Sequence, residues 1–168
     1  PVSDETKKKL SQAWKDGKYA NAPMGTGIHG YFFSIKNNKK FYYRSLLELK
    51  FLLQIEQDDT ITDFQIEPFQ IPLEDGIHHY TPDFLINHKD LIELKPANHL
   101  SYIKEEDRFL KEIEAGKKYA KEHNLDFKLI YDTDLDFESR KFKRWLCNNP
   151  NIINLYQITF DRDISKWS

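Results

Sequence analysis

Cysteine and long apolar runs are what this sequence most lacks. Its one cysteine, Cys147, can form neither an internal disulfide nor a thiolate zinc cluster, so nothing favours an oxidising compartment. No apolar run approaches the roughly 20 residues of a membrane span, and the start, PVSDETKKKL, lacks the apolar stretch of a secretory signal. We therefore expect a soluble, cytoplasmic protein without membrane contact.

Glycine is also scarce, and its placement divides the chain. Four of the six glycines lie between residues 17 and 30, where regular structure of any length is excluded. We expect residues 1–30 to form an arm or linker and residues 31–168 to form one domain, because 168 residues with 39% hydrophobic side chains can bury a single core.

Excess charge of one sign is absent overall, since the formal net charge is −2. That value argues against a nucleic-acid partner, but the distribution argues for one: residues 1–50 carry +6, and residues 51–168 carry −8. A second basic cluster at 140–144, RKFKR, fits a solvated face and DNA contact equally well.

Hydrophobic periodicity gives the expected elements. Helices are expected at 3–14, 45–57, 102–124 and 139–149. Strands are expected at 61–73, 78–87, 90–96, 127–131 and 153–160, with a hairpin at 31–45 that turns at Asn37-Asn38. The order strand, helix, strand after residue 90 predicts a parallel crossover within a mixed α/β fold.

Two carboxylates and an ammonium group are expected to converge on neighbouring strands. Asp83 begins one strand, and Glu93 and Lys95 end the next, where they share a face while Leu94 points into the opposite layer. Phosphodiester hydrolysis needs a hard cation, and Mg²⁺ is held by one or two carboxylates plus water. A lysine beside the cation can orient or deprotonate the attacking water and stabilise the charge that develops.

Glu48 is the fourth candidate, because it interrupts an otherwise apolar stripe of the helix expected at 45–57. If this helix packs across the sheet, Glu48 can reach the cation directly or through a water. Taken alone, an exposed position on the polar edge of the helix is an equally good interpretation.

Residues 41–131 resemble the nuclease core of phage-encoded PD-(D/E)XK homing endonucleases, phage head-completion nucleases and the endonuclease subunit of heteromeric transposases, most specifically at RSLLE, YTPDF and IELKP. The resemblance implies a restriction-endonuclease-like fold, an α/β core with a mixed central sheet flanked by helices. It also implies metal-binding roles for Glu48, Asp83 and Glu93, with Mg²⁺ or Mn²⁺ as the ion, and a catalytic role for Lys95.

The first residues, SDETKKKLSQAWKDGKYA, resemble the nuclease-associated modular DNA-binding motif of phage homing endonucleases. This places the basic arm against double-stranded DNA, where basic side chains would contact phosphates and Asn21 or His29 would read bases. The expected DNA-binding residues are Lys7, Lys8, Lys9, Lys15, Lys18, Asn21, His29, Lys39, Lys40 and Arg44.

The leading hypothesis is a site-directed, Mg²⁺-dependent endonuclease of double-stranded DNA, of phage or mobile-element type, that works in the cytoplasm, which is the host's if the protein is phage-encoded. Cutting both strands needs two active sites, so a homodimer or sequential nicking is expected. A junction-resolving or head-completion nuclease, a DNA-binding module with a non-catalytic nuclease core, and a small-molecule hydrolase are the alternatives.

Overall fold

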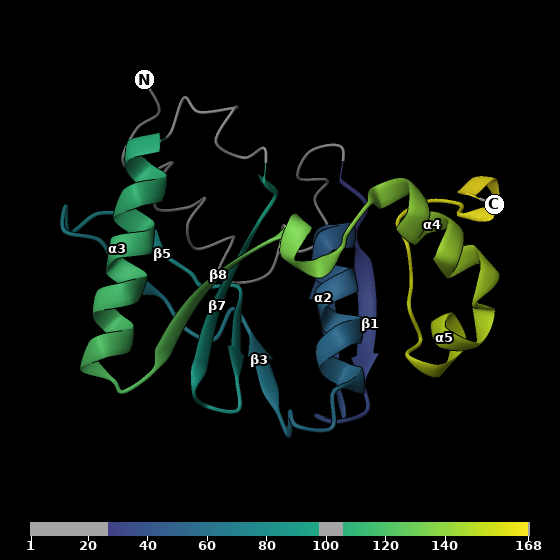
Figure 1. Cartoon of the computed structure of the whole chain (residues 1–168), viewed down its shortest axis with the longest axis horizontal. Coiled ribbons are helices and arrows are strands. Elements are labelled where there is room, and N and C mark those ends of the chain that lie inside the picture. The colour runs from purple at the N-terminus through teal and green to yellow at the C-terminus, as the bar shows by residue number, and fades with distance from the viewer. Residues whose placement is uncertain (1–26, 98–105, 168) are drawn as a thin grey trace, which may run out of the picture.

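A four-stranded mixed sheet forms the centre of the protein (Figure 1). The computed structural model describes residues 27–97 and 106–167. The strand order is β3 (Phe64–Ile66), β6 (Phe84–Ile86), β7 (Asp90–Lys95) and β8 (Asp126–Tyr131). The first three strands are antiparallel, and β8 pairs with β7 in parallel after the crossover through α3 (Glu106–Glu122). The mixed α/β fold class is confirmed.

Two of the expected long strands are each broken into two short ones. The segment 61–73 forms β3 and β4 (Ile71–Pro72), and 78–87 forms β5 (His79–Tyr80) and β6. Strands β4 and β5 pair as a separate hairpin. The breaks fall at Glu67, which has a positive φ of 46° and precedes a proline, and at Thr81-Pro82, because proline cannot donate to a ladder.

Helices cover the two faces of the central sheet (Figure 1). On one face, Phe84, Ile92 and Leu94 share a core with α2 (Leu46–Gln57) and the β1–β2 hairpin. On the other face, Leu85 and Leu91 pack with β4, β5 and α3 in a smaller core. The helix expected at 102–124 is confirmed from residue 106 onward, and its earlier residues lie outside the described ranges. Leu110 lies on the solvent side of α3 and is exposed.

The amino-terminal hairpin and the carboxy-terminal segment lie side by side. Strand β1 (Gly30–Ser34) pairs with β2 (Lys39–Tyr43), and its other edge is bonded to residues 156–161. Helix α4 (Ser139–Asn148) is confirmed, but the strand expected at 153–160 is wrong. Helix α5 (Pro150–Leu155) continues to residue 155, and residues 156–160 form a turn and an irregular segment that bonds to β1. Asn149-Pro150 starts this helix, since proline suits the first helical turn.

Candidate active site

Asp83 and Glu93 lie side by side where β6 begins and β7 ends. The backbone N–H of Asp83 donates to the carbonyl of Ile92 at 3.0 Å, and the Asp83 Oδ2 atom accepts from the N–H of Leu94 at 2.7 Å. The carbonyl of Asp83 also accepts from the N–H of Glu67 at 2.9 Å. Backbone bonds on both sides therefore fix Asp83 against the strand that carries Glu93 and Lys95.

Glu93 is a buried carboxylate whose two oxygens both have partners. Its Oε1 atom lies 3.0 Å from the Nζ of Lys95, and its Oε2 atom accepts a hydrogen bond from the hydroxyl of Tyr80 at 2.6 Å. Glu93 is 3% exposed, so these partners replace the water that burial removes. Leu94 points into the opposite core as the strand pattern predicted.

Glu48 lies in the first turn of α2, and its carboxylate has a structural task. Its Oε2 atom accepts from the backbone N–H of Arg44 at 2.8 Å, while its own N–H donates to the Ser45 hydroxyl at 3.1 Å. This resembles a capping box, in which a serine and a glutamate three residues later satisfy free N–H groups at a helix start. Glu48 therefore stabilises the start of α2 whatever else it does.

All three carboxyls have raised pKa values, and burial is the main cause for each. Burial raises the pKa of Asp83 well above its ordinary value, and the nearby charges of Glu93 and Glu48 add to the rise. Burial also raises the pKa of Glu93, with Lys95 and Tyr80 opposing it. Burial is likewise the main cause of the raised pKa of Glu48, which Glu67 and Glu93 increase further. The carboxylates are thus close enough to repel one another.

Lys95 is held as a cation. Burial alone would lower its pKa, but the charges of Glu93 and Asp83 outweigh this effect and the net pKa is raised. Its Nζ atom lies 5.9 Å from the centre of the Phe109 ring of α3. The ammonium therefore lies between the carboxylates and the helix that covers this face of the sheet.

The donor set suits a hard divalent cation. Carboxylate oxygens are the ligands that Mg²⁺ and Mn²⁺ prefer, and one or two carboxylates with bound waters are sufficient. A cation beside Asp83 and Glu93 would also favour their charged forms, against the burial that raises both pKa values and the Glu93 charge that adds to the rise at Asp83. Across residues 27–97 and 106–167, no three His, Cys, Asp or Glu side chains already converge as a complete metal site. The donors fit two protein ligands supplemented by water.

Two further residues at this site did not emerge from the sequence. Tyr80 donates to Glu93, and the only sequence signal for it was its place in the YTPDF stretch. Glu112, one-fifth exposed on α3 and paired with Arg108 at 3.2 Å, adds negative charge that raises the pKa of Tyr80 and Glu93. A glutamate on an amphipathic helix is usually a solvated residue, so the sequence pattern does not indicate that Glu112 lies near the site.

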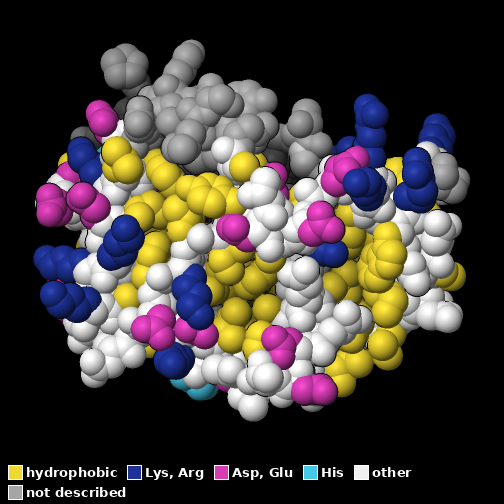
Figure 2. Space-filling model, viewed as in Figure 1, with side chains coloured by type: hydrophobic (Ala, Val, Ile, Leu, Met, Phe, Trp, Pro, Cys, Tyr) yellow, Lys and Arg dark blue, Asp and Glu magenta, His cyan; other side chains and the backbone are white. Residues whose placement is uncertain are grey.

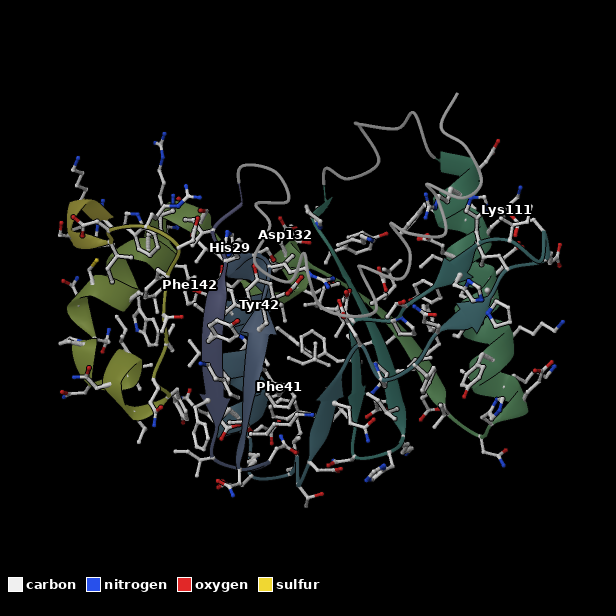
Figure 3. The ribbon with its side chains drawn as sticks, turned by 180° about the vertical axis from the view of Figure 1, so that it is seen from behind. His29, Phe41, Tyr42, Lys111, Asp132 and Phe142 are labelled. Atoms are coloured by element: carbon white, nitrogen blue, oxygen red, sulfur yellow. The ribbon has the colours of Figure 1, made fainter. Side chains whose placement is uncertain are left out.

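Several expected DNA-binding residues lie on or beside the β1–β2 hairpin. Lys39, Lys40 and Arg44 are exposed, and Arg44 pairs with Glu67. His29 is instead partly buried, because its ring is bonded to Tyr42 at 2.8 Å and lies 3.4 Å from Asp161 (Figure 3). The other expected DNA-binding residues lie outside the described ranges: Lys7, Lys8, Lys9, Lys15, Lys18 and Asn21.

The second basic cluster is on the solvent side of α4. Figure 2 shows lysine and arginine side chains gathered over α3 and over the end of the molecule that holds α4. Lys141 pairs with Glu138 at 2.8 Å, and Lys143 lies 5.5 Å from the ring of Trp167. These contacts fit a solvated face, and they leave Arg140 and Arg144 exposed.

The mixed sheet flanked by helices, with two carboxylates and a lysine at its strand ends, is a restriction-endonuclease-like fold. Residues 58–132 match the family model for the TnsA-like endonuclease N terminal domain. This match supports the PD-(D/E)XK nuclease superfamily and indicates a nuclease. It includes Asp83, Glu93 and Lys95 but not Glu48. None of the curated proteins compared with the chain matches it. No helix in the described ranges is long and apolar enough to cross a membrane.

Proposed function

We propose that this chain is a divalent-metal-dependent endonuclease that hydrolyses phosphodiester bonds in double-stranded DNA. The observation that carries the proposal is the apposition of Asp83 and Glu93 beside the Lys95 ammonium, with Glu93 buried and Asp83 half-buried. Such a grouping is costly to bury and is typical of sites where charge develops during a reaction. Its place within the endonuclease match supports the same chemistry.

Asp83 and Glu93 would hold Mg²⁺, with Mn²⁺ as a substitute, and Glu48 would join them directly or through a water. When bound, the cation neutralises charge on the phosphoryl oxygens. Lys95 would orient the attacking water or donate to a phosphoryl oxygen. Its raised pKa favours donation over proton removal, because the group is protonated at neutral pH.

The finer proposal is a site-directed homing endonuclease of a phage, acting in the host cytoplasm. Its support is the resemblance of residues 3–20 to the nuclease-associated modular motif and the charge of +6 on residues 1–50. The arm, together with Lys39, Lys40 and Arg44, would grip DNA phosphates. Cleavage of both strands would use a homodimer.

A second candidate, the endonuclease subunit of a heteromeric transposase, is favoured by the match to the TnsA-like endonuclease model. The two candidates differ in what they need for cleavage. A homing enzyme would cut a bare target on its own, whereas a transposase subunit would cut only when transposase partners hold it at an element end. Cleavage of a random-sequence library by the isolated protein favours the first candidate.

A plasmid-cleavage assay tests the shared proposal. The wild-type protein with Mg²⁺ is expected to nick or linearise a supercoiled plasmid that contains its target, and EDTA is expected to abolish this. Asp83→Ala and Lys95→Ala should each lose activity, whereas Asp126→Ala, which removes an exposed carboxylate on β8, should keep it. Equal cleavage by all four proteins would overturn the assignment.

A further inference from the structure

Tyr80 lies beneath the candidate site and is almost completely buried, with 3% of its surface exposed. It belongs to β5 in the β4–β5 hairpin, where it pairs with Ile71 rather than with the central sheet. Its hydroxyl is directed at Glu93 and donates to Oε2 at 2.6 Å. A side chain from a separate hairpin thus reaches into the sheet's carboxylate cluster.

Glu93 is held from two sides as a result. Lys95 contacts Oε1 at 3.0 Å and Tyr80 contacts Oε2, so the plane of the carboxylate is defined by one charged and one neutral donor. The last torsion of a glutamate is broad and adopts its orientation from its partners. Without the hydrogen bond from Tyr80, the Glu93 carboxylate would be free to rotate toward Lys95. It would then lose the orientation that its two partners now fix beside Asp83.

Gly116 of α3 makes room for two rings, chiefly that of Phe127 and also that of Tyr80. A Cβ atom at residue 116 would lie 3.1 Å from Cε1 of Tyr80 and 2.5 Å from Cε2 of Phe127. Glycine in a helix interior lowers helix stability relative to alanine, so its presence here serves the close packing of these two rings. The helix and the hairpin therefore meet at the residue that contacts Glu93.

We propose that Tyr80 is a positioning residue that fixes the Glu93 carboxylate for metal binding, and that Gly116 is the helix residue that makes room for it. The inference rests on the proposed nuclease function, because it assigns Glu93 to the metal. Partners of this kind, which bond to a metal ligand rather than to the metal, typically change metal affinity or activity by about 10- to 100-fold when removed.

Tyr80→Phe tests the hydroxyl directly, because the ring and its packing against α3 remain. The full-length variant is titrated with Mn²⁺ by calorimetry in the absence of DNA, and single-turnover cleavage is measured as a function of enzyme concentration. We expect Mn²⁺ affinity and the maximal cleavage rate each to fall by about 10-fold or more, while the concentration for half-maximal DNA binding stays unchanged. If Tyr80 had only a structural role, the variant would instead have a lower thermal midpoint, and Mn²⁺ affinity and cleavage would not fall selectively relative to DNA binding.

Tyr119→Phe is the matched control. Tyr119 belongs to α3. Its ring stacks on His123 with the ring centres 3.8 Å apart and lies 4.6 Å from the ring of Phe69, away from the carboxylates. Its loss of a hydroxyl should leave Mn²⁺ affinity and cleavage at the wild-type level.

Gly116→Ala tests the second half of the proposal. The added methyl group should lower Mn²⁺ affinity, as Tyr80→Phe does. The double variant Gly116→Ala/Tyr80→Phe should bind Mn²⁺ no more weakly than the weaker-binding of the two single variants. Phe127→Leu is added to Gly116→Ala to remove the closest contact with the new methyl group, so that an effect that persists is assigned to the Tyr80 ring. Lys117→Ala, at an exposed position of the same helix, is the control.

The outcomes separate this inference from the proposed function. Wild-type Mn²⁺ affinity in Tyr80→Phe, or failure of the wild-type protein to bind Mn²⁺ at all, overturns the positioning role. If the wild-type protein binds Mn²⁺ but cleaves no DNA, the proposed nuclease function fails, and weaker Mn²⁺ binding by Tyr80→Phe still supports the role of Tyr80.

Discussion

Glu48 has a structural task that can be separated from its proposed chemical one. Its carboxylate accepts from the N–H of Arg44, which a glutamine oxygen can also do, whereas alanine cannot. Only a charged carboxylate would serve a cation well. The two substitutions therefore divide the roles of this residue.

We expect Glu48→Gln to keep wild-type stability and lose cleavage, and Glu48→Ala to lose both, with a stability cost of about 1 kcal/mol from the missing helix cap. Urea denaturation and the plasmid assay measure the two effects. Ser45→Ala, which removes the other half of the cap, is expected to lower stability but leave cleavage nearly intact. Full cleavage by Glu48→Gln would remove Glu48 from the metal site.

The half-buried carboxyl of Asp83 makes the free energy of unfolding depend on pH in a defined direction. Its pKa is raised in the folded state, mainly by burial and by Glu93, so folding favours the protonated form. The stability that this provides is fully present below the ordinary aspartate pKa, near about 4, and is lost as pH rises through the folded value. At neutral pH, the ionised Asp83 carboxylate therefore lowers the free energy of unfolding of the metal-free protein.

Asp83→Asn should stabilise the metal-free protein, because the amide oxygen can still accept from the N–H of Leu94 and carries no charge. The urea midpoint of the variant is expected to exceed that of the wild-type protein at about pH 8, with the difference shrinking toward about pH 4. Added Mg²⁺ should reduce the difference by stabilising the wild-type protein alone. A lower midpoint for Asp83→Asn at about pH 8 would contradict the repulsion between these carboxyls.

At the scale of elements, Gly30 joins two parts of the fold that are far apart in the sequence. A Cβ atom there would lie 2.0 Å from the carbonyl oxygen of Thr159 and 2.9 Å from the Tyr43 hydroxyl, which itself donates to that carbonyl. Only glycine lets β1 approach residues 156–161 this closely. The carboxy-terminal part is thus fixed to the hairpin that precedes α2.

Gly30→Ala should separate this edge and lower the free energy of unfolding by about 1–3 kcal/mol, the usual cost of overpacking. Hydrogen exchange is expected to be faster at the Thr159 and Asp161 amides, which donate to the carbonyls of Tyr31 in β1 and of His29 just before it. Gly76→Ala is the comparison, since its turn has a positive φ of 68° but no atom within 4 Å, so it should cost only about 1 kcal/mol in local strain. Unchanged exchange in Gly30→Ala would refute the coupling.

The elements predicted best from the sequence were those whose signal is local. The helix at 45–57 has a serine cap and an apolar stripe, and the Asp83, Glu93 and Lys95 arrangement follows from strand alternation. The β4–β5 hairpin was missed because its strands of two residues are too short to show a period. The positions of Tyr80 and Gly116 depend on how this hairpin packs against α3, which no local pattern encodes.

At the scale of the whole molecule, two basic regions compete for the role of DNA contact. The arm carries Lys7, Lys8 and Lys9, and α4 carries Arg140 and Lys141. Each phosphate contact that is lost lowers the dependence of affinity on salt by about 0.9 in a double-logarithmic plot. The change in this slope when a region's basic residues are replaced therefore measures how many phosphate contacts that region makes.

Replacing the three arm lysines with glutamine should weaken DNA binding and reduce the slope by about 2–3, whereas replacing Arg140 and Lys141 should change neither much. Fluorescence anisotropy in Ca²⁺ at several salt concentrations measures both quantities without cleavage. A larger slope change for the α4 variant would assign the DNA contact to α4 instead of the arm.

Hydrolysis of DNA by the Asp83, Glu93 and Lys95 cluster is the central claim, and metal-triggered single-turnover cleavage tests it most directly. Protein and target DNA are combined in EDTA, and the reaction is started with excess Mg²⁺. The wild-type complex should cleave only after Mg²⁺ is added, while Glu93→Gln and Lys95→Met complexes bind equally but cleave about 10²–10⁴-fold more slowly. Cleavage by either variant at the wild-type rate would contradict the assignment of this site.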